Sequence, residues 1–101
     1  MAFPEIVPGP GVVRQVLAEH PDLMIVAFRF ETGGVGALHS HPHVQGTFVQ
    51  SGRFRFQQGD AFSEVGPGDS FVIASGVVHG CECLEAGVLI DSFTPRRDDF
   101  L

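Results

Sequence analysis

Hydrophobic residues along the chain fall in short runs that glycine- and proline-rich turns separate. The runs are rich in β-branched and aromatic residues, which are typical of strands. Residues 52–57 (GRFRFQ) alternate polar and apolar side chains with the period of two of a half-buried strand. No segment carries a helical apolar stripe of useful length. Strands are therefore predicted over residues 12–17, 23–30, 46–50, 53–56, 70–73 and 88–93.

The turns complete the prediction of the fold class. Gln58-Gly59-Asp60 and Gly66-Pro67-Gly68-Asp69 combine the residue types that favour tight turns. Many short strands joined by such turns are typical of an all-β sandwich or barrel. The chain has 101 residues and shows no repeat, linker or low-complexity tract, so residues 1–101 are predicted to form a single all-β domain.

Composition and charge exclude several functions. All six basic residues are Arg, and the chain contains no Lys, Asn, Tyr or Trp. A lysine Schiff base, a tyrosine acid or base and an asparagine ligand are therefore excluded. The net charge is −6, with no basic run, which argues against binding to nucleic acid or to an anionic membrane surface.

The first residues and the cysteines bear on the compartment. Residues 1–13 lack the basic and apolar regions of a signal peptide, and no apolar run approaches the roughly 20 residues that span a bilayer. Cys81 and Cys83 are one residue apart, a spacing that strains a disulfide in an extended strand. We therefore predict reduced thiols and a cytoplasmic protein.

Three of the five histidines lie in the segment His39-Ser40-His41-Pro42-His43. In an extended strand, positions 39, 41 and 45 project to one face, so two imidazoles and the Gln45 carboxamide oxygen can converge on one ion. The alternative is that the histidines are exposed or satisfied in the core. His43 shares the parity of the ligands, but Pro42 can bend the strand. Contact with substrate and exposure to solvent both stay open for His43.

The spacing of glycines around these histidines resembles the two motifs of the cupin superfamily. Gln45 replaces the usual Glu of the first motif, and Ala74 and Cys83 replace the usual Pro and Asn of the second. The matching positions are Gly33, His39, His41, Gln45 and Gly52, then Gly68, Gly76 and His79. The resemblance implies a jelly-roll β-barrel with one divalent metal ion held by His39, His41, Gln45 and His79.

Four neutral ligands leave the ion's full charge of +2 uncompensated, which favours Lewis-acid chemistry on an anionic substrate over redox chemistry. The ligand types leave Zn, Ni, Mn and Fe open as the metal. Cys81 and Cys83 share the parity of His79 and could add thiolate ligands, although small buried thiols more often only fill space. We favour space filling.

The C-terminal segment adds a second group of candidates. Asp91 lies in an otherwise apolar strand, where an ionised carboxylate is rarely buried without a partner. If the face shared by Asp91 and Phe93 points inward, the carboxyl enters the metal cavity. The alternative is an aspartate at the barrel rim that is paired with Arg96 or Arg97.

The pattern Asp-x-Phe-x-Pro-x-Arg-x-Asp-Phe-Leu over residues 91–101, together with His-Ser-His-Pro-His-x-Gln over 39–45, resembles the pectin-degradation cupins of the KdgF type. The resemblance implies conversion of unsaturated monouronates to their linear keto form. It places the family's catalytic residues on Asp91 and Arg97 and the substrate-side Phe on Phe93. From the residue types, we expect Asp91 to transfer protons and Arg97 to bind the substrate carboxylate. Arg96 and Val44 depart from the family pattern, where Pro and Glu are usual.

Two other functions compete with this interpretation. A non-haem metal dioxygenase uses the same fold, although cupin dioxygenases usually retain Glu or a third histidine among the ligands. A non-catalytic cupin that binds a small molecule is the second alternative. The many phenylalanines also favour a homodimer, with Phe54 or Phe56 as candidates for its buried surface.

Overall fold

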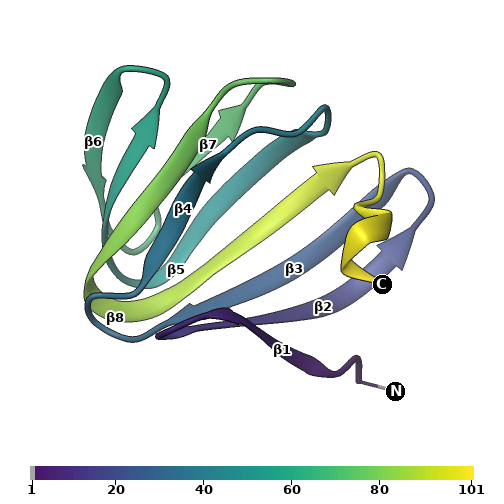
Figure 1. The fold of residues 1–101 in the computed structure, drawn as a ribbon, viewed down its shortest axis with the longest axis horizontal. Coiled ribbons are helices and arrows are strands. Elements are labelled where there is room, and N and C mark those ends of the chain that lie inside the picture. The colour runs from purple at the N-terminus through teal and green to yellow at the C-terminus, as the bar shows by residue number, and fades with distance from the viewer. Residues whose placement is uncertain (1) are drawn as a thin grey trace.

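The computed structural model describes residues 2–101, most of which lie in antiparallel strands (Figure 1). A short 3-10 turn, η1 (Asp98–Phe100), follows the last strand. The all-β prediction is confirmed. The strands are β1 (Glu5–Gly9), β2 (Val12–His20), β3 (Leu23–Phe30), β4 (Val35–His39), β5 (Val44–Gln58), β6 (Ala61–Val65), β7 (Ser70–Ile73) and β8 (His79–Thr94).

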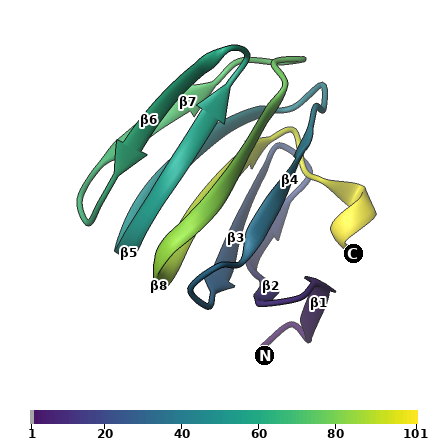
Figure 2. The ribbon, with the colours of Figure 1, turned by 60° about the vertical axis from the view of Figure 1, so that its left-hand side comes forward.

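Two long strands, β5 and β8, hold the sheet together. The sheet runs in the order β1-β2-β3-β8-β5-β6, while β4 pairs with β8 and β7 pairs with β5. The first part of β8 pairs with β4 and the second part with β3, and β5 accompanies β8 along both parts. The strands consequently form two facing layers that share β5 and β8, and β8 turns from one layer into the other (Figures 1 and 2).

Glycine makes this turn between the layers possible. The register of β5 against β8 shifts around Ser51 and Arg53, and Gly52 there has a φ of +79°. A Cβ on Gly52 would lie 2.5 Å from the Glu85 carbonyl oxygen, and one on Gly87 would lie 2.1 Å from the Ser51 carbonyl oxygen. Both distances are below any real contact distance, so β5 and β8 can approach this closely only where both carry glycine.

The period-two pattern places the core and the site on one inner surface. In β5 the buried side chains are Gln45, Thr47 and Val49 before the irregularity, then Phe54 and Phe56 after it. The irregularity at Gly52 changes the parity, so both halves of β5 face inward. The alternation GRFRFQ predicted from the sequence is therefore present, with both phenylalanines inside.

Several predicted strand boundaries are wrong. The predicted strands over residues 46–50 and 53–56 are one strand, β5, because its glycine bends the chain without ending the pairing. The predicted strand over 88–93 is only the end of β8. The short strands β1, β4 and β6 were not predicted, because they are mainly exposed and lack apolar runs.

Phe54 and Phe56 are core residues, with side chains 0% and 4% exposed. Their proposed place in a dimer interface is therefore wrong, because neither can reach a second chain, and the homodimer stays a prediction. Within residues 2–101, no helix is long and apolar enough to cross a membrane.

Candidate functional site

The predicted metal ligands come from three strands and one loop at the same end of the barrel. His39 is the last residue of β4, Gln45 is the second residue of β5, and His79 is the first residue of β8. His41 lies between β4 and β5. The expectation that positions 39, 41 and 45 share one strand face is thus wrong, because the strand ends at His39 and the chain bends through Pro42.

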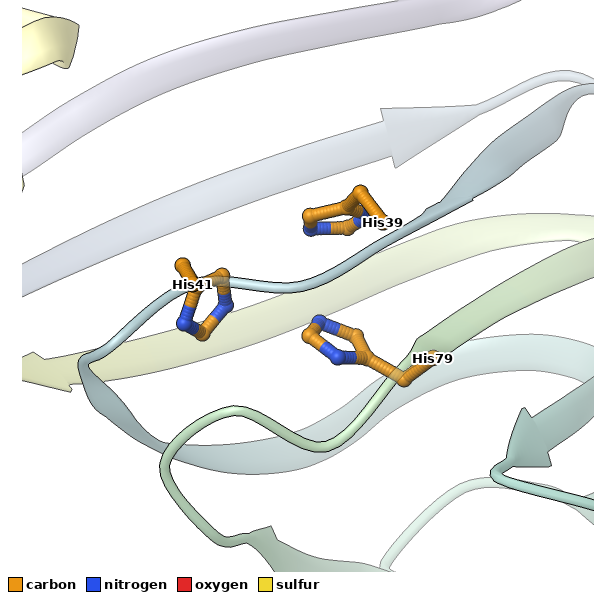
Figure 3. A group of neighbouring side chains, drawn as sticks. All are labelled: His39, His41 and His79. Atoms are coloured by element: carbon orange, nitrogen blue, oxygen red, sulfur yellow. The ribbon is translucent and has the colours of Figure 1, made fainter.

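The bend nevertheless brings the three imidazoles together. The ring of His79 lies 4.3 Å from that of His39 and 4.9 Å from that of His41, measured between centroids. One potential ligand atom from each ring lies within 4.8 Å of the others, and Figure 3 shows the rings turned toward one another. His41 and His79 are buried, whereas His39 is exposed.

Backbone carbonyl groups orient all three rings in the same way. The Nδ1 atoms of His39, His41 and His79 lie 2.8, 3.0 and 2.9 Å from the carbonyl oxygens of Ala37, His43 and Val77. A carbonyl oxygen only accepts, so Nδ1 carries the proton of each neutral ring and Nε2 keeps its lone pair. This is the arrangement that metal-binding histidines use.

Two further observations fit a cation at this position. The Nε2 atom of His79 is buried and has no hydrogen-bond partner within residues 2–101. The Nε2 atom of His41 lies 3.0 Å from Gln45 Oε1. Burial lowers the pKa of His41, so its ring is neutral and cannot donate from both nitrogens. His41 Nε2 and Gln45 Oε1 are then both hydrogen-bond acceptors, and a separation of 3.0 Å between two acceptors is favourable when a cation lies between them.

A hydrogen-bonded chain links this group to Asp91. Gln45 Nε2 donates to Thr47 Oγ1 at 3.0 Å, and Thr47 Oγ1 donates to Asp91 Oδ1 at 2.7 Å. All three side chains are buried. Burial raises the pKa of Asp91 to about 7, although the bonds from Thr47 and Gln45 and the charge of Arg97 oppose the rise. Asp91 therefore points inward and is not the rim aspartate of the alternative interpretation.

The two arginines of the C-terminal segment have other partners. Arg96 forms ion pairs with Glu19 and Asp98 on the surface. Arg97 donates through Nε (3.2 Å) and Nη2 (2.8 Å) to Asp99, and its guanidinium lies 5.2 Å from the Phe93 ring centroid. Asp99 thus occupies the Nε–Nη2 edge of the Arg97 guanidinium, and Nη1 has no hydrogen-bond partner within residues 2–101.

One cavity of about 490 Å³ contains most of these groups. His39, Gln45, His79, Asp91, Phe93 and Arg97 all line it, together with apolar side chains such as Phe28, Phe30 and Leu89. His43 is not among its lining residues. The His43 ring lies 5.5 Å from that of His41, and its buried Nδ1 has no hydrogen-bond partner within residues 2–101. Substrate contact by His43 stays a prediction.

The cysteines take two different positions. Cys81 lines the cavity, and burial raises its pKa to about 12, so it is a neutral thiol. Cys83 belongs to the hydrophobic core. Neither sulfur joins the group of potential metal ligands found in residues 2–101, which agrees with the space-filling role favoured from the sequence.

Thr47 and Asp99 were missed as functional candidates. Thr47 lies two residues after Gln45 and therefore faces the same side of β5, a polar residue between buried positions. That signal was present in the sequence. Asp99 belongs to the C-terminal pattern over residues 91–101, but its contact with Arg97 could not be predicted, because it depends on the turn of η1.

The fold and the site define a class of protein. The cupin domain family matches residues 26–92, and the chain belongs to this family. It is 36% identical over 95 residues to "Pectin degradation protein KdgF" of Dickeya dadantii (strain 3937), covering 92% of this chain and 86% of the relative.

Two solved structures are similar over nearly the whole chain. The structure of KdgF from Halomonas sp. shares 38% identity with a TM-score of 0.92 and covers 98% of this chain and 92% of that one. An RmlC-like cupin from Shewanella frigidimarina shares 35% identity with a TM-score of 0.93, covering 98% and 89%. The chain thus resembles the KdgF type of cupin in sequence and in structure.

Proposed function

We propose that this protein is a metal-dependent isomerase that converts unsaturated monouronates to their linear keto form. The observation that carries the proposal is the buried Asp91 carboxyl, which shares a cavity with His39, His79 and Arg97. Thr47 joins this carboxyl to Gln45 through hydrogen bonds. The similarity to two proteins named KdgF, one of them described as a pectin degradation protein, supports this choice of substrate.

The donor set fits a divalent ion held by His39, His41, Gln45 and His79. Such an ion supplies a positive charge that stabilises negative charge on sugar oxygens. The histidines and the carboxamide are neutral ligands, so they leave that charge available to an anionic sugar. The backbone carbonyls that hold the rings keep the ligands in place before the ion binds.

The reaction is an isomerisation, so no co-reactant is needed. The ring carbon–oxygen bond opens, one proton leaves the anomeric hydroxyl and one is added to the alkene carbon. In this proposal Asp91, whose pKa of about 7 suits proton transfer at neutral pH, carries the proton between these positions. Arg97 binds the substrate carboxylate through its free edge, and Phe93 packs against the sugar and excludes water.

The test follows the absorbance of the unsaturated uronate, whose double bond disappears on ketonisation. The chain contains no Trp or Tyr, so its own absorbance interferes little. We expect turnover well above the protein-free rate, loss of turnover with a chelator and recovery when a divalent ion is restored. Asp91→Asn keeps the shape of the side chain but loses the carboxylate, and its rate should fall by at least about a hundredfold.

Metal content and melting temperature measured on Asp91→Asn control for damage to the site, and both should stay close to the wild-type values. Full activity of Asp91→Asn would remove the proton carrier from the proposal. A wild-type rate equal to the protein-free rate would contradict the whole proposal. Oxygen uptake, measured in parallel, would then support the dioxygenase alternative.

A further inference from the structure

Arg14 lies on the inner face of β2 and lines the same cavity as Asp91 and Arg97. The neighbouring inward residues of β2, Val12 and Val16, are buried in the core. Arg14 is therefore an arginine placed in the middle of an otherwise apolar inner face. Such a position costs solvation of the guanidinium, and burial accordingly lowers the pKa of Arg14.

Arg14 also differs from the other arginines in its partners. Four of the other five donate a hydrogen bond to a carboxylate or carboxamide oxygen, and the fifth, Arg55, is exposed and stacks on Phe62. Within residues 2–101, Arg14 has neither a hydrogen-bonded partner nor an ion-pair partner. The four paired arginines are Arg29, Arg53, Arg96 and Arg97.

The neighbouring Arg97 cannot supply a net positive charge by itself. Asp99 binds its Nε and Nη2 atoms, and the bond from Arg97 lowers the pKa of Asp99, which is therefore ionised. A ligand carboxylate that reaches Arg97 meets an almost neutral ion pair. The charge of Asp99 also acts on Arg14, but one aspartate cannot neutralise two arginines, so Arg14 leaves this group with a net charge of +1.

Phe100 brings the two guanidinium groups to the same place. Its ring centroid lies 4.1 Å from the guanidinium carbon of Arg14 and 4.1 Å from that of Arg97. Both planar groups thus rest on one aromatic ring, which restricts their orientation. The ring belongs to η1, which lies beside the open end of the barrel next to β2 and β3 (Figure 1).

We propose that Arg14 is a second carboxylate-binding residue of the cavity, which attracts and holds the anionic group of the substrate while Arg97 orients it. The choice of a uronate as that substrate rests on the proposed function. The binding of a sugar carboxylate by Arg14 does not require turnover, so the role of Arg14 and the proposed reaction can be tested separately.

The test measures binding of galacturonate, a saturated uronate without the reactive double bond, and of neutral galactose by calorimetry on metal-loaded protein. Arg14→Gln should weaken galacturonate binding about ten- to a hundredfold and leave galactose binding unchanged, because only the charged hydrogen bonds are lost. Arg14→Lys keeps the charge without the planar fork, so its affinity for galacturonate should lie between those of the wild type and Arg14→Gln. Arg55→Gln, which removes a stacked arginine outside the cavity, is the matched control and should bind as the wild type does.

With unsaturated uronate, Arg14→Gln should raise KM more than it lowers kcat. Unchanged galacturonate binding in Arg14→Gln, an equal loss of galacturonate and galactose binding, or no galacturonate binding by the wild type would overturn the proposal. If thermal melting shows that Arg14→Gln does not fold, the same binding measurements on Arg14→Lys decide whether Arg14 binds the carboxylate. If Arg14→Gln loses galacturonate binding while the wild type does not turn over unsaturated uronate, the role of Arg14 is supported and the proposed isomerase activity is rejected.

Discussion

Thr47 shows how one hydroxyl can set the direction of a hydrogen-bonded chain. The two ends of the Gln45 carboxamide are similar in size, and only hydrogen bonds decide which of them faces His41. Thr47 has one proton, which it donates to Asp91, so its oxygen is left to accept from the Gln45 amide nitrogen. The Gln45 oxygen is thereby directed toward the histidines.

Replacing Thr47 by Val should therefore weaken metal binding without removing a ligand. Valine has nearly the shape of threonine but leaves the Gln45 amide and the Asp91 carboxyl without their shared partner. Losing a group that orients a metal ligand typically costs about ten- to a hundredfold in metal affinity. Competition with a chelating dye measures this affinity directly.

Thr47→Ser is the matched control, because serine keeps the hydroxyl and loses only a methyl group. Its metal affinity should stay within a few-fold of the wild-type value, because the loss of one methyl group disturbs the site only slightly. Equal affinity in Thr47→Val and the wild type would show that Gln45 is oriented by other contacts.

At the scale of the strands, the close approach of β5 and β8 around Gly52 and Gly87 positions the site. His79 and Asp91 lie on opposite sides of the turn in β8, yet they face the same cavity. The turn depends on Gly52, which has a positive φ and almost touches β8.

Gly52→Ala should consequently cost more stability than alanine at another glycine of the same conformation. Gly68 has a φ of +89°, but a Cβ there would meet nothing within 4 Å. Gly68→Ala should cost only the backbone strain, about 1–2 kcal/mol. Gly52→Ala should add about 1–3 kcal/mol for the overlap with β8. Denaturant unfolding of both variants measures the difference, and equal losses of stability would mean that β5 and β8 move apart easily at this point.

The same strands show what could be predicted from the sequence. Alternation placed Asp91 and Phe93 on one face of the last strand but left open whether that face points inward. An aspartate among apolar neighbours correctly marked Asp91 as unusual. Arg14 between Val12 and Val16 carries the same signal, a charged residue among apolar positions of one strand face. The continuity of β5 could not be predicted, because a glycine that bends a paired strand and one that ends it look alike in sequence. The pairing of Asp99 with Arg97 could not be predicted either, because it depends on how the chain turns after β8 in the folded protein.

At the scale of the whole molecule, the candidate ligands connect parts of the barrel that are distant in sequence. His39 and His79 are partners across β4 and β8, while Gln45 pairs with Phe93 at the far end of β8. An ion held by these residues would cross-link both layers. The ligands cluster only in the folded chain, so metal binding should be coupled to folding.

Adding a divalent ion such as Zn²⁺ or Ni²⁺ to metal-free protein should therefore raise its melting temperature. At a free ion concentration one hundred times the Kd, the folded state gains about 2.7 kcal/mol. In a domain of this size, each kcal/mol raises Tm by about 4–8 °C, so a rise of roughly 10 °C or more is expected. Calorimetry over a series of ion concentrations measures it, and excess chelator should reverse it.

The double variant His41→Ala His79→Ala is the control for this last prediction. It keeps His39, His20 and His43, which can bind ions weakly on the surface or in the unfolded chain, but it loses both buried rings of the cluster. Its melting temperature should not rise with added ion, and binding to the unfolded chain can even lower it. An equal rise in the variant and the wild type would place the stabilising ion elsewhere on the molecule and reject the cluster as the metal site.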